Sequence, residues 1–148
     1  MGQSPTEPTS IDRLRRAGLR PTRQRLALAE ILFSGADRHV TAEQLYGEAL
    51  AQSIEVSLAT IYNTLNQFTE AGLLRELIPS PGCSYFDTNT DDHHHFFFEE
   101  SGTLLDVPSS DIVLANLPPA PHGSTVRRVD IVIRLAGQNA AENRRVQD

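Results

Sequence analysis

The chain has 148 residues, 39% of them hydrophobic, which is enough for one or two small domains with their own cores. No apolar run approaches the roughly 20 residues of a membrane span, and the polar first ten residues do not resemble a secretory signal, so a cytoplasmic protein is expected. A single cysteine, Cys83, excludes a disulfide framework within the chain and any zinc site built on cysteine pairs.

The net charge of −6 argues against general nucleic-acid binding, but the charge is unevenly distributed. Residues 10–30 hold six arginines against two acidic residues, whereas residues 91–111 hold six acidic residues and no arginine or lysine. A basic segment attracts phosphate and an acidic one attracts cations, so the two halves are expected to have different tasks.

The first part of the chain is predicted to be mainly helical. Residues 1–9 are rich in Pro, Ser and Thr and are expected to be disordered. Gly18 and Gly72 are expected to end the first and the fourth of four helices, the fourth over residues 58–71, and Gln44 completes a capping box at the start of the third. The N-caps predicted for the four helices are Ser10, Thr22, Thr41 and Ser57.

The pattern changes after the fourth helix. Residues 73–78 and 83–87 have the composition of two strands, joined by a Pro-Ser-Pro-Gly turn signal. Helices followed by a two-stranded hairpin make a winged helix-turn-helix. Residues 10–88 are therefore predicted to form a winged-helix DNA-binding domain.

Residues 89–136 are predicted to form a small α/β domain, followed by a flexible tail over residues 137–148. The elements expected in this domain are strands at 94–99 and 103–107, a short helix at 108–117 and a final strand at 126–135. The predicted fold class is α+β, with an N-terminal winged helix and a C-terminal domain for dimerisation and sensing.

The fourth predicted helix has the character of a DNA-recognition helix. Its apolar residues Leu58, Ile61, Leu65 and Phe68, with Leu73 just beyond, fall at helical spacing and are expected to be buried. Uncharged side chains of the kind that contact base edges, thymine methyl groups and phosphates lie on the other face, at Ala59, Thr60, Tyr62, Asn63, Asn66 and Gln67, and all of them except Ala59 can hydrogen-bond. The alternative is an ordinary amphipathic surface helix. The preceding helix and the arginine-rich segment favour DNA, and Arg20, in a loop, could enter a minor groove.

The stretch from Asp91 to Glu100 contains three of the five histidines, four carboxylates and three of the six phenylalanines. Imidazole nitrogens and carboxylate oxygens are ligands that Zn²⁺, Fe²⁺ and Mn²⁺ accept, although solvated loops are also rich in histidine. In a strand, His93 and His95 would point one way and His94 the other, which predicts two environments. The phenylalanines are expected in a dimer core, or beside a porphyrin.

Three segments carry a resemblance to a known family: Gly-Leu-Arg-Pro-Thr-Arg-Gln-Arg at 18–25, His-Val-Thr-Ala-Glu-Gln-Leu-Tyr at 39–46 and Ser-Leu-Ala-Thr-Ile-Tyr-Asn-Thr-Leu at 57–65. With the histidine run, they strongly resemble the ferric uptake regulator (Fur) family over residues 11–136. The His-His-His-Phe-Phe run without Cys-x-x-Cys pairs is similar to the iron response regulator (Irr) branch, whose members respond to haem. The resemblance implies a homodimer or tetramer that regulates iron-homeostasis genes, often as a repressor, by binding AT-rich inverted repeats.

The resemblance also implies particular sites. Arg20 would reach the minor groove, and Tyr62 and Asn63 would meet base edges. The full set of expected DNA contacts is Arg20, Arg23, Ser57, Thr60, Tyr62 and Asn63. The expected ligands of a regulatory Fe²⁺ or Mn²⁺, or of Zn²⁺ in vitro, are His39, Asp87, His93, His94, His95 and Asp106, and the last three histidines are also candidate haem ligands. The cysteines of the family's structural zinc would fall near Glu99 and Ser101, which predicts that no such zinc is bound.

The predicted mechanism is a clamp. An ion held by His39 and Asp87 from the first half and by His94 and Asp106 from the second would fix the angle between the halves, and with it the spacing of two recognition helices. The alternatives are a metal-buffering or haem-carrying module or, less in keeping with the sequence, a metalloenzyme. The chain shows no nucleophile–base pairing, phosphate loop or His-Glu-x-x-His motif, so it is not expected to be an enzyme.

Overall fold

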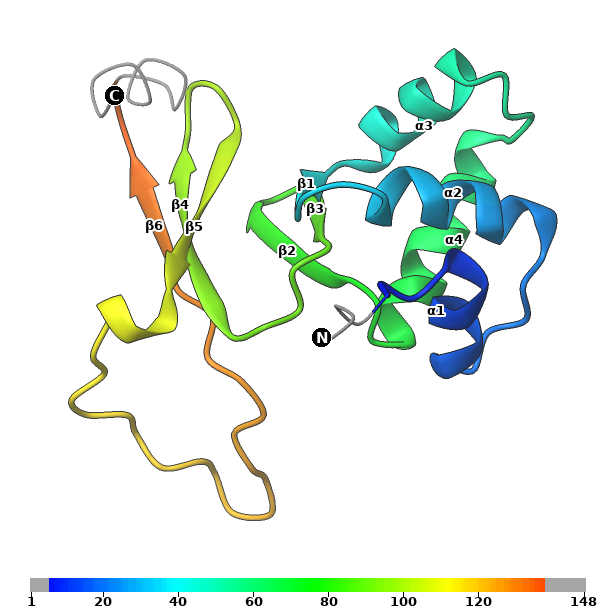
Figure 1. Ribbon diagram of the computed structural model, residues 1–148. Coiled ribbons are helices and arrows are strands. Elements are labelled where there is room, and N and C mark those ends of the chain that lie inside the picture. Colours follow the sequence, from blue (N-terminus) through cyan, green and yellow to red (C-terminus); the bar gives the residue numbers. More distant parts are fainter. Residues whose placement is uncertain (1–5, 138–148) are drawn as a thin grey trace, which may run out of the picture. The chain divides into compact units, whose positions relative to one another are not determined.

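The computed structural model describes residues 6–137, and the chain divides into two compact units between Thr90 and Asp91 (Figure 1). The predictions of a disordered segment at 1–9 and a flexible tail at 137–148 lie mostly outside the described residues. None of the helices within residues 6–137 is long and apolar enough to cross a membrane.

The first unit is a winged helix-turn-helix, as predicted. Its elements are α1 (Ser10–Arg16), α2 (Arg23–Phe33), β1 (His39–Val40), α3 (Ala42–Ala51), α4 (Leu58–Glu70), β2 (Arg75–Ser80) and β3 (Cys83–Asp87). The three strands pair antiparallel in the order β1-β3-β2. β1 was not predicted, because two residues are too few to show alternation.

Side-chain caps begin the helices where hydroxyl residues precede them. The hydroxyls of Thr22, Thr41 and Ser57 each accept the backbone N–H three residues further on, as predicted, and Gln44 completes the capping box of α3. For α1 the expected cap is displaced by one residue. Thr9, rather than Ser10, accepts the Asp12 backbone N–H at 3.2 Å.

The core of the first unit forms where α4 meets the other helices. The side chains of α4 that are buried there are Ile61, Thr64, Leu65 and Phe68. The three apolar ones, Ile61, Leu65 and Phe68, belong to a cluster that includes Leu14, Leu28, Leu32, Leu45 and Phe86. Leu58, which was predicted to be buried, is 36% exposed, because it lies in the first turn of the helix at the edge of this core.

The second unit is built on a three-stranded sheet. Its elements are β4 (His93–Phe98), β5 (Thr103–Pro108), the 3₁₀ turn η1 (Ser109–Asp111) and β6 (Val132–Leu135). β4 lies in the middle, antiparallel to β5 and parallel to β6, in the order β5-β4-β6. Consequently the histidine run lies on the central strand of this sheet.

Two predictions for this unit are wrong. The helix expected at 108–117 is only the single turn η1, and the strand expected at 126–135 begins at Val132. Short helices need a packed apolar face, and the apolar side chains of this segment are exposed, Val113 at 86%. Residues 112–131 instead form a long connection that returns the chain to the sheet (Figure 1, yellow to orange).

Candidate functional site

The outward face of α4 is polar and uncharged. Tyr62, Asn63, Asn66 and Gln67 are exposed along it, and Thr60 is half-buried. The predicted phosphate contact at the helix start, Ser57, is used in the cap: its Oγ accepts the Thr60 N–H at 3.1 Å. Asn and Gln side chains along one open face can hydrogen-bond to base edges in a major groove.

Tyr62 is held by a neighbour that the sequence did not single out. Its hydroxyl donates to the Glu43 carboxylate, on the first turn of α3, at 2.5 Å. This hydrogen bond raises the pKa of Tyr62 above its ordinary value and lowers the pKa of Glu43. Glu43 therefore fixes the direction of the one aromatic side chain on the exposed face of α4.

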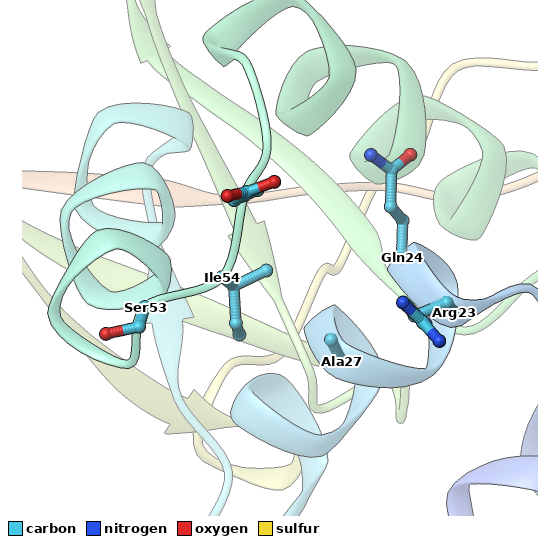
Figure 2. Close-up of a pocket in the computed structure, with 6 residues that line it drawn as sticks. Arg23, Gln24, Ala27, Ser53 and Ile54 are labelled. Atoms are coloured by element: carbon cyan, nitrogen blue, oxygen red, sulfur yellow. The ribbon is translucent and has the colours of Figure 1, made fainter.

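The arginines expected at DNA lie near the start of α2. Arg20 and Arg23 are both exposed, Arg20 in the loop after α1 and Arg23 at the first position of α2. A shallow groove of about 430 Å³ runs beside Arg23, between the start of α2 and the connection that follows α3. Figure 2 shows Arg23 and Gln24 on one side of it and Ser53 and Ile54 on the other.

In the first unit, strand pairing brings His39 and Asp87 together. They are partners in the β1–β3 register, and His39 Nε2 lies 3.1 Å from Asp87 Oδ2. Asp87 is buried, and its other oxygen accepts the Asn89 N–H at 2.9 Å. Arg38, directly before β1, and Thr88, directly after β3, bond to each other beside the pair: the Arg38 N–H donates to Thr88 Oγ1 at 2.8 Å, and the Thr88 N–H donates to the Arg38 carbonyl at 3.0 Å.

In the second unit, two histidines meet one carboxylate. His93 and His95 lie on one face of β4 with ring centroids 4.5 Å apart, as the alternation predicted. Asp106, opposite His95 on β5, places Oδ1 3.4 Å from His93 Nε2 and 3.5 Å from His95 Nε2. His93 Nδ1 lies 2.6 Å from the Asp91 carbonyl oxygen. Because a carbonyl only accepts, Nδ1 carries the hydrogen of this bond, and Nε2 is the nitrogen that faces Asp106.

His94 has a different environment. Its Nδ1 accepts the backbone N–H of Ile131, just before β6, at 3.2 Å. The clamp hypothesis placed His94 beside Asp106; that pairing is wrong, because strand alternation puts His93 and His95 there instead. The expectation of two environments for the run is met within this sheet, whereas ligation of a metal or haem by His94 stays a prediction.

The donors in each unit fit a divalent cation. In each group an imidazole nitrogen faces a carboxylate oxygen within 4.8 Å. Two acceptors at such distances repel one another unless a proton or a cation lies between them. Nitrogen and oxygen donors without sulfur are accepted by Mn²⁺, Fe²⁺ and Zn²⁺. The hydrogen bond from His93 Nδ1 to a backbone carbonyl is the kind that orients ligating histidines.

Fold and side chains together define a winged-helix protein with clustered imidazole and carboxylate groups of a kind that fits a divalent cation. The sequence pattern of the ferric uptake regulator family matches residues 16–132. The chain therefore belongs to the ferric uptake regulator family, which confirms the resemblance of the three segments.

Similarity to individual proteins points the same way. The peroxide-responsive repressor PerR of Staphylococcus aureus is 39% identical over 97 residues, 66% of this chain; the match spans 65% of that protein's length. The ferric uptake regulator of Pseudomonas aeruginosa with manganese has a TM-score of 0.67 at 25% identity, over 88% of this chain and 98% of that one. The ferric uptake regulator of Francisella tularensis with iron has the same fold, with a TM-score of 0.67 at 19% identity, over 82% of this chain and 93% of that one.

Proposed function

We propose that this chain is a metal-responsive regulator that binds operator DNA as a homodimer in the cytoplasm, and that it is not an enzyme or a metal-buffering module. The observation that carries the proposal is the exposed, uncharged hydrogen-bonding face of α4, in a member of this family. A buffering module needs only the ligands. It would have no use for a face of this kind with exposed arginines nearby.

On DNA, the proposed contacts divide into two kinds. Arg23, with the helix start at Ser57 and Thr60, lies near phosphates, and such contacts supply affinity without sequence information. Tyr62 and Asn63 meet base edges in the major groove, while Arg20 enters the adjacent minor groove. Guanidinium groups favour the narrow minor groove of AT-rich DNA, so AT-rich inverted repeats near iron-related genes are the proposed operators.

The proposed effector is Fe²⁺ or Mn²⁺. His39 and Asp87 in the first unit and His93, His95 and Asp106 in the second are the proposed ligands, because their donor chemistry fits these ions. When bound, the ion would supply between these imidazole nitrogens and carboxylates the positive charge that otherwise only a proton can supply. It can change operator affinity only if it favours the DNA-binding arrangement of the chain over others. The clamp between ligands of both units stays a prediction.

The similarity to a peroxide-responsive repressor favours a second candidate signal, peroxide acting on the metal-loaded protein. The iron response regulator branch, with haem as the effector, is a third. The three differ in what changes operator binding, so one experiment separates them.

The test starts from the purified full chain and a random duplex library, because the operator is unknown. Sites selected by the Mn²⁺-loaded protein are compared with scrambled duplexes in gel shifts at several salt concentrations. Affinity for the selected site is then measured for apo, Mn²⁺-, Fe²⁺- and haem-loaded protein, and for Fe²⁺-loaded protein after peroxide treatment.

The proposal expects Mn²⁺ or Fe²⁺ to raise the affinity for the selected site about 10-fold or more over that of the apo protein, a typical allosteric coupling. The scrambled duplex should bind more weakly than the selected one. Loss of binding with haem or after peroxide identifies the physiological signal. Enrichment of no common sequence, with equal binding to scrambled DNA, would reject the regulator in favour of the buffering module.

A further inference from the structure

We propose that Arg25 is a positioning residue, which ties the loop that carries Arg20 to the recognition helix α4 and so sets the distance between minor-groove and major-groove contacts. This inference rests on the proposed function. It assigns Arg25 a role inside the protein, whereas an arginine of this basic segment would ordinarily be expected at a phosphate.

The geometry places one guanidinium between two elements. Arg25 lies in the first turn of α2, where its backbone N–H donates to the cap Thr22 at 3.3 Å. Its Nη1 donates to the Arg20 carbonyl at 3.0 Å, and its Nη2 donates to Gln67 Oε1 on α4 at 3.0 Å. Gln67 is 42 residues further along the chain, so the link is tertiary rather than local.

An arginine suits this link better than a lysine. The guanidinium presents several donors in one rigid plane, so two acceptors can be held in a fixed relation, whereas a lysine ammonium is a single point on a flexible stem. Both acceptors are uncharged. The guanidinium can only donate, so Gln67 must turn its oxygen toward Arg25 and keeps its amide nitrogen as a donor.

The loop itself has little freedom once this link is made. Gly18 adopts φ +79°, the Leu19 N–H donates to the Leu14 carbonyl at 2.9 Å, and Pro21 fixes the backbone directly after Arg20. Holding the Arg20 carbonyl therefore fixes the point from which the exposed Arg20 side chain extends. Because the same guanidinium holds α4, the two proposed DNA-contacting elements move as one.

The test is a set of double-mutant cycles on the full chain, with the duplex selected above. The variants are Arg25→Ala, Arg20→Ala, Gln67→Ala and their pairwise combinations with Arg25→Ala. The A·T positions that matter are first found as those where Arg20→Ala loses its preference over G·C. Discrimination is then the affinity of the selected duplex divided by that of a duplex with G·C pairs at these positions. Arg128→Ala, which removes one exposed arginine of the second unit, is the matched charge control.

Arg25→Ala is expected to lower this discrimination about 10-fold, as Arg20→Ala does, and the double variant is expected to be no worse than the worse single one. Gln67→Ala should lower it less, with no further loss in the Arg25→Ala background. Arg128→Ala should leave the ratio unchanged. Arg25→Lys, which keeps the charge, should bind scrambled DNA as the wild type does but should not recover discrimination.

Additive losses from Arg25→Ala and Arg20→Ala would overturn the inference, and so would full discrimination in Arg25→Lys, because both results describe an independent phosphate contact. These outcomes presuppose that the wild-type chain prefers the selected duplex. If the wild type shows no such preference, the proposed function is wrong. If the wild type shows it but the losses in the variants are additive, only the inference about Arg25 is wrong.

Discussion

Individual side chains on the exposed face of α4 are held by partners inside the first unit, before any DNA is bound. Glu43 accepts from the Tyr62 hydroxyl, and Arg25 donates to Gln67. Fixing a side chain before binding reduces the entropy lost on binding, so such pairs favour specific over adaptable recognition. The acidic partner has a cost, since Glu43 adds a negative charge near a face proposed to meet phosphates.

The Tyr62–Glu43 pair gives a prediction at the same scale. The carboxylate accepts the phenol hydrogen, and its charge disfavours phenolate, so Tyr62 should ionise above its ordinary pKa of 10.0. In Glu43→Ala the Tyr62 titration should move down toward that value. Phenolate absorbance against pH, with Tyr62→Phe subtracted in each background, isolates this tyrosine from the other two. An unchanged midpoint would show that the pair is not formed in solution.

The same two shifts fix the pH window in which the pair stabilises the fold. Because the folded pKa of Glu43 is depressed, its contribution is present above the ordinary value of 4.5 and is lost as pH falls through the folded pKa. The folded pKa of Tyr62 is raised, so its contribution is present below 10.0 and is lost as pH rises through the folded pKa. The urea midpoints of wild type and Glu43→Gln should differ most between these values and converge on both sides.

At the scale of helices, replacing either of two glycines that have open space around them with alanine should change the stability of the fold, in opposite directions. Gly72 ends α4 with φ +82°, where an L side chain is strained, so Gly72→Ala should destabilise the chain by about 1 kcal/mol. Gly47 lies inside α3, where alanine is the better helix former, so Gly47→Ala should stabilise by roughly 0.5–1 kcal/mol. Urea unfolding of both variants checks this, and shifts of the same sign would contradict it.

The elements that could be predicted from sequence are those whose signals are local. Hydroxyl caps located the starts of α2, α3 and α4, a glycine located the end of α4 to within a residue, and the composition around a turn located the hairpin. Elements that depend on a distant partner could not be predicted. β1 exists because Val40 pairs with Phe86, and β6 is short because only Val132 to Leu135 pair with β4.

In the candidate site too, features with a local sequence signal could be predicted, and features that depend on a distant partner could not. Residue types and strand alternation predicted that His93 and His95 share a face. The register of β4 against β5 places Asp106 beside His93 and His95 rather than His94, and no local sequence signal indicates that register. Glu43 and Arg25 were not found as partners because each bonds to a side chain on another helix, 19 and 42 residues away.

For the molecule as a whole, the apolar side chains on the connection after η1 predict self-association. Leu114 and Leu117 are about half exposed and Val113 is almost wholly exposed, which fits a surface that a second copy covers. Leu114→Ser with Leu117→Ser should raise the dimer dissociation constant at least 10-fold in sedimentation equilibrium. Ile78→Ser, which removes a 59% exposed side chain from β2, is the control. Equal dissociation constants in the double variant and the wild type would place the dimer surface elsewhere.

Metal binding should stabilise the fold in a way that shows which units hold the ion. A ligand that binds only the folded state stabilises it by about 2.7 kcal/mol at a hundred times its dissociation constant. Each unit has its own buried side chains, so thermal unfolding can show two transitions. An ion held by His93, His95 and Asp106 alone should raise the Tm of one transition. A clamp revised to hold the ion with His93, His95 and Asp106 and with His39 and Asp87 as well should raise the Tm of both.

Variants then assign the ligands. His93→Ala with His95→Ala should abolish the Mn²⁺-induced Tm shift of the second unit, because it removes both imidazoles beside Asp106. His122→Ala, at an exposed position of the long connection, should leave the shift intact. His39→Ala separates the remaining cases: under the clamp it lowers the shift of both transitions, whereas with independent sites it leaves the second unit's shift unchanged. A full shift in the variant that lacks both His93 and His95 would exclude these histidines as ligands, and with them the proposed effector site of the second unit.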